Sequence, residues 1–325
     1  MEENRSKGDG RTMTQAEMKA KLKGKHFLKL ADFSKSELQY LIDQAIQLKE
    51  EQKAGKTHRH LEGKTMIFEK SPTRTRVYFE TGMYQLGGHA LFLSKDELQM
   101  GRGETISDTA KVLSRYVDGI MIRTFGHDIV EELAENSSVP IINGLTDDYH
   151  PCQVLADLMT IVEKKGSLEG KKLAYVGDGN NMAHSLLIGS AIMGLNCSVS
   201  TPKNDEVKQE IFSIAKEKAK ATNAVIEQTN DPIEAIKDAD IIYTDVWTSM
   251  GFEDEENERL KAFSDFQVNG ELIKYAKEDF LFFHCLPAHR GEEVTADVID
   301  GPHSVVFDEA ENRLHAQKAI LATLL

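Results

Sequence analysis

The segment Lys70-Ser71-Pro72-Thr73-Arg74-Thr75-Arg76 follows an apolar run, Thr65-Met66-Ile67-Phe68, and precedes an amphipathic stretch that reaches Leu86. The apolar run predicts a buried strand. Ser71 is a favoured helix N-cap residue and Pro72 fits the first helical position, so the strand should lead directly into a helix. Free backbone N–H groups at such an end, beside two arginines and two threonines, favour a small anion. An ordinary basic helix start in solvent is the alternative.

The 325 residues carry a formal net charge of −14, and 40% of them are hydrophobic. This length suffices for one large or two medium domains. The acidic balance argues against nucleic acid or an anionic membrane as a main partner, and no apolar run approaches the roughly 20 residues that span a bilayer. The cysteines are three and widely spaced, which predicts no disulfide framework: Cys152, Cys197 and Cys285. We therefore expect a cytoplasmic protein.

Short apolar runs alternate with helical patterns from Thr65 onward, which predicts parallel sheets covered by helices on both faces. The predicted strands are Thr65–Phe68, Ala90–Leu93, Gly119–Ile122, Ile141–Gly144, Lys172–Val176, Ser198–Ser200, Ala224–Glu227, Ile241–Thr244, Leu281–His284 and Ser304–Phe307. The predicted helices are 34–49, 105–116, 127–136, 151–165, 181–194, 205–221 and 269–277. Ten strands are many for one sheet, so we expect an α/β protein of two domains, hinged near helix 151–165.

Ligands of such folds bind beyond the carboxyl ends of the strands. The segments that follow these ends are rich in polar and reactive side chains: 71–76, Arg123-Thr124, 147–153, 177–181, 245–251 and 285–290. Each has a plainer explanation when taken alone, since Arg123 could cap a strand and Cys285 could be a small buried apolar residue. The sequence therefore predicts a site from the pattern as a whole.

Three of these segments leave alternatives open. His150 could simply begin a helix, but with Gln153 one turn later the pair can donate to one carbonyl oxygen. Gly177-Asp178-Gly179-Asn180-Asn181 only half matches the dinucleotide fingerprint, because the third glycine is missing. It better suits a turn that presents amides to a zwitterion. The acidic segment Gly251–Asp265 is most simply a solvated, mobile loop, although a long loop over a site can be a lid.

Four motifs resemble those of the ornithine transcarbamylases, and the resemblance extends from about residue 25 to the end. They are Thr73-Arg74-Thr75-Arg76, His150-Pro151-Cys152-Gln153, Asp245-x-x-x-Ser249-Met250-Gly251 and His284-Cys285-Leu286-Pro287. The first two are shared by all transcarbamylases, and the last two together point to ornithine. Pro72 departs from the family pattern, because it stands where the phosphate motif usually carries its first serine.

The resemblance implies a role for each position and no cofactor, and the histidines and cysteines lack the spacing of metal ligands. Pro72, Thr73, Arg74, Thr75 and Arg123 would hold the phosphate of carbamoyl phosphate. Thr75, Arg123, His150, Gln153, the Leu286 carbonyl and Arg313 would hold its carbamoyl group, near Cys285. Asn181, Asp245, Ser249 and Met250 would bind L-ornithine, with Cys285 beside its δ-amine. The catalytic residues would be Arg123, His150, Asp245 and Cys285. Gln99 would reach carbamoyl phosphate from a neighbouring subunit, which implies a trimer.

The resemblance also implies domain limits and leaves rival functions to be tested. Residues 15–155 with the returning C-terminal helix 309–325 would be a carbamoyl-phosphate domain, and 156–308 an ornithine domain. Residues 1–14 are polar and have no apolar period, so we expect a disordered arm there. A putrescine enzyme would need neither Asn181 nor the Ser249-Met250 turn, and an acetylornithine or aspartate enzyme fits the Asp245 motif less well. A nucleotide-dependent oxidoreductase and an idle homologue are the rivals from other classes.

Overall fold

The computed structural model describes residues 12–69, 73–94, 100, 103–248 and 255–325. All paired strands in its two sheets are parallel. The first sheet has the order β2 (His89–Leu93), β1 (Thr65–Glu69), β3 (Gly119–Arg123), β4 (Ile141–Leu145). The second has the order β7 (Ile226–Thr229), β6 (Asn196–Ser200), β5 (Lys172–Val176), β8 (Ile241–Thr244), β9 (Leu281–His284). The predicted two-domain α/β architecture is confirmed.

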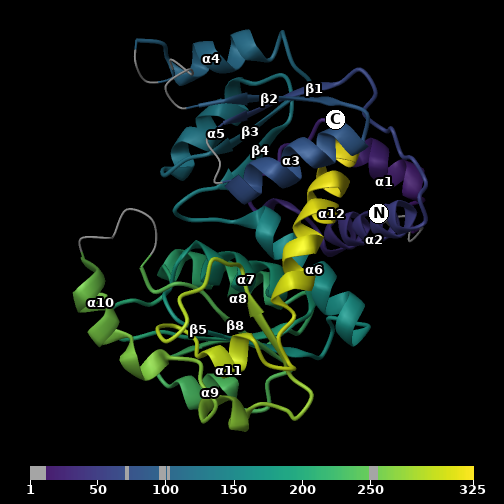
Figure 1. Cartoon of the computed structure of the whole chain (residues 1–325). Helices are drawn as coiled ribbons and strands as arrows, with labels where there is room; N and C mark the ends of the chain where they lie inside the picture. The colour runs from purple at the N-terminus through teal and green to yellow at the C-terminus, as the bar shows by residue number, and fades with distance from the viewer. Residues whose placement is uncertain (1–11, 70–72, 95–99, 101–102, 249–254) are drawn as a thin grey trace, which may run out of the picture.

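Helices cover both sheets, as Figure 1 shows. The helices up to the middle of the chain are α1 (Gln15–Leu22), α2 (Lys35–Lys53), α3 (Thr73–Gln85), α4 (Ile106–Leu113), α5 (His127–Asn136) and α6 (Pro151–Lys165). Those that follow are α7 (Asn181–Met193), α8 (Gln209–Ala219), α9 (Pro232–Ile236), α10 (Glu256–Ala262), α11 (Ala296–Ile299) and α12 (Val306–Leu324). Short 3₁₀ turns lie at Leu30–Asp32, Ser264–Phe266 and Leu272–Tyr275. Because both faces are covered, all of β8 is buried.

The C-terminal helix α12 returns to the first sheet's side of the molecule, as predicted. It packs on α2, α3 and α6 and also contacts β9 of the second sheet (Figure 1). Asn312 anchors it, because its Nδ2 donates to Thr160 Oγ1 on α6 across 2.9 Å and its Oδ1 accepts from Lys49 Nζ on α2 across 2.8 Å. One apolar core runs from Met66 of the first sheet to Leu173 of the second. Packed side chains thus join the two halves, whose exact predicted boundaries stay predictions.

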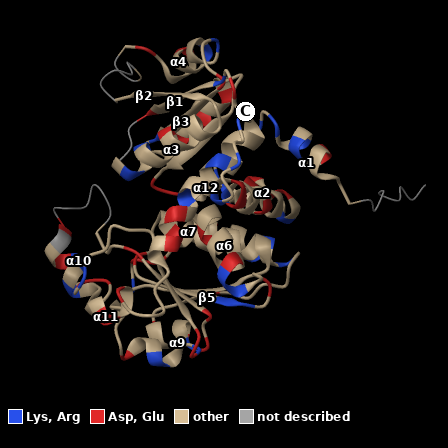
Figure 2. Cartoon of the chain, turned by 45° about the vertical axis from the view of Figure 1, so that its right-hand side comes forward, with Lys and Arg blue, Asp and Glu red and all other residues tan. Residues whose placement is uncertain are grey.

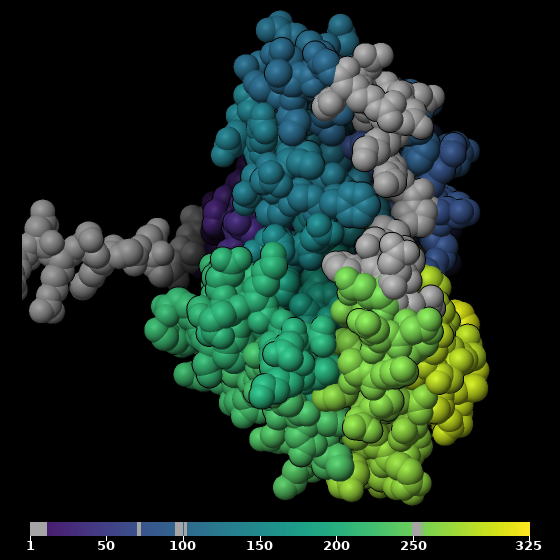
Figure 3. Space-filling model, turned by 90° about the vertical axis from the view of Figure 1, so that its left-hand side faces the viewer, coloured from purple at the N-terminus to yellow at the C-terminus, as the bar shows by residue number. Residues whose placement is uncertain are grey.

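In the space-filling view the blue and teal first half lies above the green and yellow second half (Figure 3). Figure 2 shows that the positions of basic and acidic residues are interspersed along the ribbon of both halves. In the part of the chain that the structure describes, no helix combines the length and apolar character that a bilayer crossing requires.

Two of the predicted elements were wrong. Residues 304–307 are not a tenth strand: Ser304 forms only an isolated bridge with Phe282, and α12 begins at Val306. A short apolar run is compatible with a strand and with the buried start of a helix. Here the run forms the first residues of the long helix α12. Residues 269–277 hold only the 3₁₀ turn Leu272–Tyr275 instead of a helix. The predicted Ser71 cap lies outside the described residues.

Candidate active site

A chain of hydrogen bonds joins three helices where the first sheet meets α12. The Tyr78 hydroxyl on α3 donates to Thr75 Oγ1 across 3.0 Å. Arg313 of α12 donates from one guanidinium nitrogen to the Tyr78 hydroxyl and from the other to Gln153 Oε1 on α6. Thr75, Gln153 and Arg313 are all buried. The fold thus unites residues that the sequence assigned to one substrate, and adds Tyr78, which the motifs did not reveal.

His150 is the N-cap residue of α6, and its side chain is buried. Its backbone N–H donates to Ser185 Oγ on α7 across 2.9 Å, which fixes the helix start against the second half. Burial, followed by the charges of Arg313 and Arg123, lowers the pKa of His150 well below its ordinary value. His150 is therefore neutral near pH 7. Its Nδ1 is buried and has no hydrogen-bond partner among the described residues, so the ring still has a polar atom to satisfy.

Arg123 is the last residue of β3, and its side chain is half-buried. Burial lowers the pKa of its guanidinium, the nearby Tyr78 and Cys285 raise it, and Arg313 lowers it. Arg123 is therefore close enough to Tyr78 and Arg313 for their charges to act on its guanidinium. It belongs to the same part of the molecule as Thr75 and Gln153, which are linked to Tyr78 and Arg313 by hydrogen bonds.

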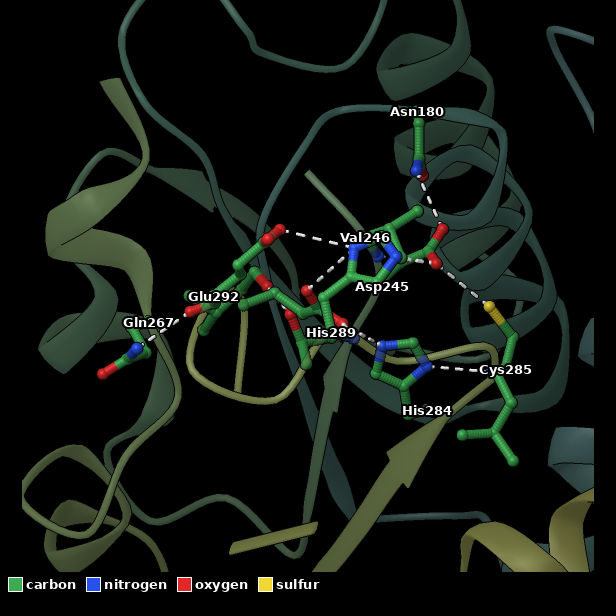
Figure 4. Close-up of polar contacts among 12 residues, drawn as sticks. Asn180, Asp245, Val246, Gln267, His284, Cys285, His289 and Glu292 are labelled. Atoms are coloured by element: carbon green, nitrogen blue, oxygen red, sulfur yellow. Dashed lines mark hydrogen bonds and ion pairs between the residues drawn. The ribbon is translucent and has the colours of Figure 1, made fainter. Parts of the chain in front are cut away.

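The second half contributes a hydrogen-bonded pair, Asp245 and Cys285 (Figure 4). The Cys285 thiol donates to Asp245 Oδ1 across 3.1 Å, and Asn180 Nδ2 donates to Asp245 Oδ2 across 3.0 Å. The backbone N–H of Val246 also donates to Asp245 Oδ1. Burial and the Asp245 charge raise the pKa of the Cys285 thiol well above its ordinary value. The cysteine is therefore a neutral thiol, which is a poor nucleophile.

A buried pair behind Cys285 holds its loop in place. His284 Nε2 lies 2.9 Å from Glu293 Oε1, and both side chains are fully buried. The backbone N–H of Leu286 donates to His284 Nδ1 across 2.8 Å, so the ring proton must be on Nε2, facing Glu293. Leu286 has a positive φ of 57°, and the backbone N–H of His289 also donates to Glu293. Sequence reasoning missed Glu293, because it lies nine residues beyond His284.

The glycine-rich loop before α7 packs against the chain itself. A Cβ at Gly179 would come within 2.4 Å of the Asp205 carbonyl oxygen, so only glycine fits. Asn180 caps α7 by accepting from the backbone N–H groups of Met182 and Ala183. The backbone N–H groups at the start of α7, which would bind the phosphate of a dinucleotide, are thus already hydrogen-bonded to Asn180. Asn181, the residue predicted to bind ornithine, donates to the Thr146 carbonyl across 2.7 Å.

Part of the acidic segment 251–265, predicted most simply as a mobile loop, is held in place. Arg259 on α10 forms an ion pair with Asp178 across 2.7 Å and donates to the Trp247 carbonyl. Its guanidinium also lies over the Phe263 ring, and Phe263 is fully buried. The prediction of a loop is therefore wrong where α10 forms, although Glu258 on this helix is exposed, as expected of a solvated acidic segment. A lone arginine in an acidic stretch gave no signal of this role.

Several predicted site residues cannot be placed: Pro72, Gln99, Ser249 and Met250 lie outside the described residues. Thr73 and Arg74 are exposed at the start of α3. Sequence spacing predicts no metal site, and this stays a prediction. The fold does bring together two groups of metal-binding side chain types: Asp245, His284 and Cys285, and His289, Glu292 and Glu293. Members of both groups are engaged in the hydrogen bonds described above.

Comparisons with known proteins agree with this geometry. Residues 25–163 match the carbamoyl-P binding domain of aspartate/ornithine carbamoyltransferase, and residues 169–324 match the Asp/Orn binding domain. The chain is 62% identical over 306 residues to the ornithine carbamoyltransferase of Anoxybacillus flavithermus, covering 94% of this chain and 98% of that protein.

Two solved structures extend the likeness to the fold. The Pyrococcus furiosus ornithine carbamoyltransferase superimposes with a TM-score of 0.91 at 55% identity, covering 93% of this chain and 97% of that one. A structure described as anabolic ornithine carbamoyltransferase, from Campylobacter jejuni, gives 0.86 at 41% identity, covering 91% and 97%. The chain therefore belongs to the ornithine carbamoyltransferases, within the aspartate/ornithine carbamoyltransferase family of transferases.

Proposed function

We propose that this chain transfers the carbamoyl group of carbamoyl phosphate to the δ-amine of L-ornithine, giving L-citrulline and phosphate. The observation that carries the proposal is the hydrogen-bonded cluster in which Arg313 donates to Gln153 and to Tyr78, and Tyr78 donates to Thr75. This cluster joins residues of the two motifs predicted to bind carbamoyl phosphate. Arg123, whose pKa is affected by Arg313, would add a second cation for the anionic leaving group.

The phosphate would bind at the start of α3. Thr73, Arg74 and Thr75 lie in its first turn, where backbone N–H groups and the helix dipole favour an anion. Arg123 approaches from the end of β3. Stationary cations and a helix N-terminus ease the departure of phosphate, because their interaction grows as the leaving group gains charge.

The carbamoyl oxygen gains negative charge as the amine attacks, so it needs aimed donors. Thr75, Arg123 and His150 supply them. His150 suits this role, because burial and two arginines keep its ring neutral and its Nδ1 has no partner among the described residues. The Gln153 amide oxygen and the Leu286 carbonyl would accept hydrogen bonds from the carbamoyl NH₂ group, and Arg313, which donates to the same Gln153 oxygen, would complete the pocket.

The amine half of the reaction centres on Asp245. Its carboxylate and the Asn181 amide would bind the charged α-groups of ornithine, together with Ser249 and Met250. The attack is direct, because the neutral Cys285 thiol does not supply a nucleophile. The amine nitrogen bonds to the carbamoyl carbon, the carbon–oxygen bond to phosphate breaks, and the amine proton passes to the departing phosphate or to Asp245.

We further propose that substrates add in order, carbamoyl phosphate first. Its groups come mainly from the first half, and ornithine then closes the second half and residues 248–266 over it. Arg259 joins α10 to Asp178 of the second half, so this part of the segment would move together with that half. Product-inhibition kinetics with a random pattern would contradict the order.

The assembly is proposed to be a homotrimer in which Gln99 enters a neighbouring site. An exposed apolar face on α3 and the edge strand β2 supports self-association: Val77 is 57% exposed, Tyr84 81% and Leu91 40%. Light scattering of the purified chain measures the mass, and an active monomer would contradict the trimer. We also propose a cytoplasmic role in arginine synthesis, in line with the anabolic relative from Campylobacter jejuni.

Parallel assays with L-ornithine and putrescine test the function. Carbamoyl phosphate is supplied in both, and formation of the ureido product is measured. We expect strong preference for ornithine with citrulline as product. Preference for putrescine would retain the carbamoyl-phosphate half and reject the amino-acid site, while activity with neither amine would reject the function altogether.

A further inference from the structure

Two buried carboxyl groups lie directly behind Gln153. Asp157 on α6 and Glu309 on α12 are 0% and 1% exposed, in a region that the proposed chemistry does not use. Gln153 Nε2 donates to Asp157 Oδ1 across 2.9 Å and to Glu309 Oε1 at 3.3 Å. Both carboxyls lie one helical turn from a proposed substrate-binding residue, since Asp157 follows Gln153 by four positions and Glu309 precedes Arg313 by four.

Donors from the second sheet hold Glu309 from the other side. The Tyr243 hydroxyl on β8 donates to Glu309 Oε1 across 2.9 Å, and the backbone N–H of His284 on β9 donates to Oε2 across 3.0 Å. Asp157 Oδ2, by contrast, has no hydrogen-bond partner among the described residues. The two carboxyls therefore have different surroundings: both oxygens of Glu309 accept hydrogen bonds, whereas Asp157 Oδ2 accepts none from the described residues and can carry a proton.

Two carboxylates cannot both stay charged in such a place. Burial raises the pKa of Asp157 to about 6, and burial with the Asp157 charge raises the pKa of Glu309 well above its ordinary value. Arg313 lowers the pKa of Asp157, and Tyr243 hydrogen-bonds to the pair, so one negative charge remains supported. Two interacting carboxyls in one site titrate as a unit that keeps a single proton.

We propose that Asp157 and Glu309 share one proton and act as a positioning pair for Gln153. The pair binds the amide nitrogen, so the amide oxygen is turned toward Arg313 and the site. The reversed amide would place its oxygen against two carboxyl oxygens, which is unfavourable. This inference rests on the proposed function, in which Gln153 and Arg313 hold the carbamoyl group, and it assigns a role to two residues outside all four motifs.

Steady-state kinetics of matched variants test the pair. Asp157→Asn and Glu309→Gln each replace one carboxyl by an amide that imitates the protonated acid, and we expect less than a threefold loss of kcat/KM for carbamoyl phosphate. Asp157→Leu removes the acceptor at similar size, and we expect a loss of tenfold or more. Thr160→Val is the control, because Thr160 links α6 to Asn312 on α12 without touching Gln153. It should change kcat/KM less than twofold.

A double-mutant cycle separates positioning from general packing. If Asp157 acts through Gln153, then Asp157→Leu in a Gln153→Ala background should cost less than a further twofold. Losses that multiply, a loss in Thr160→Val as large as in Asp157→Leu, or full activity of Asp157→Leu would each overturn the proposal.

A spectroscopic signature keeps the test independent of turnover. The infrared difference between wild type and Asp157→Asn near pH 7 should show the carbonyl stretch of one protonated carboxyl, and its absence would overturn the shared proton. If the wild type forms no citrulline, the proposed function fails. The infrared band and the NMR signals of the Gln153 side-chain amide, compared between wild type and Asp157→Leu, then decide the pair alone: an unshifted amide would overturn it.

Discussion

The Cys285 thiol donates a hydrogen bond to Asp245 Oδ1 across 3.1 Å, and burial holds the thiol in its neutral form. Because a hydroxyl can make the same bond, Cys285→Ser should retain turnover with a loss of about tenfold or less, the value of one hydrogen bond. Steady-state citrulline formation measures this, with Cys285→Ala as the variant that cannot donate and should lose more. Isolation of a carbamoylated Cys285 from the wild type, with no turnover in Cys285→Ser, would contradict direct attack.

His184 predicts how stability depends on pH. Its Nδ1 faces the Asp148 carbonyl and its Nε2 accepts from the Lys208 N–H, which fixes the neutral ring, and burial lowers its pKa to about 4. In the unfolded chain His184 binds a proton as the pH falls below about 6.5, whereas in the folded chain it stays neutral down to about pH 4. The free energy of unfolding therefore decreases as the pH falls from about 6.5 toward about 4. Over this window His184 accounts for about 3 kcal/mol.

Denaturant unfolding of wild type and His184→Asn at pH 7 and pH 4.5 measures that contribution. Asparagine can still donate to the Asp148 carbonyl but does not titrate, so the variant should lose less stability on acidification than the wild type. An equal loss of stability in the two proteins would show that other groups, such as the buried His150, determine the loss of stability at acidic pH.

Replacing Asn180 should affect both stability and ornithine binding, whereas replacing Asn181 should affect mainly ornithine binding. Asn180 caps α7 and holds Asp245, so Asn180→Ala should cost about 1 kcal/mol of stability and also weaken ornithine binding. Asn181→Ala should raise the KM for ornithine about tenfold or more with little change in Tm. If the KM is unchanged and only Tm falls, Asn181 serves solely as the tie to the Thr146 carbonyl.

Arg259 and Asp178 form a mostly buried ion pair at the base of the segment that begins with α10. Burial raises the pKa of Asp178 to about 6, against the pull of Arg259. Arg259→Ala should therefore destabilise the protein by about 2 to 3 kcal/mol at pH 8, where the carboxylate is left charged. The cost should shrink at pH 5, because Asp178 then takes up a proton.

Chemical denaturation at the two pH values checks this difference. Adding Asp178→Asn to Arg259→Ala should recover part of the stability at pH 8. The exposed pair of Lys274 and Glu271 supplies the control, since Lys274→Ala should cost less than about 0.5 kcal/mol. An equal cost of Arg259→Ala at both pH values would show that stacking on Phe263 matters more than charge.

Pro72 supports a prediction from sequence alone. Ser71, or the amides of Thr73 and Arg74, should compensate for the missing serine, so Pro72→Ser should change the KM for carbamoyl phosphate only modestly. An improvement of tenfold or more, about 1.4 kcal/mol, would mean that the natural phosphate site is weakened by the proline.

Local pattern was sufficient for most of the fold. Strands such as Lys172–Val176 and Ile241–Thr244 were predicted with their observed bounds, because a short apolar run between turn residues has few other uses in an α/β chain. The strand predicted at 304–307 was wrong, because a short apolar run at the buried start of a helix has the same sequence pattern as a strand. The segment predicted as a loop contains helix α10, whose Arg259 is anchored by residues far away in the sequence.

The sequence by itself determined the architecture and the motifs, because helix caps, apolar periods and strand-end residues are local properties. Only the tertiary structure decided the partners. In the structure Asp245 accepts a hydrogen bond from Asn180 and not from the neighbouring Asn181. Glu293 pairs with His284, and Asp157 is buried next to Glu309, with Gln153 donating to both carboxyls. These pairings depend on which side chains face one another once α6, α12 and the second sheet have packed. Proton sharing and shifted pKa values follow from that packing, because burial removes the water that would otherwise solvate each charge.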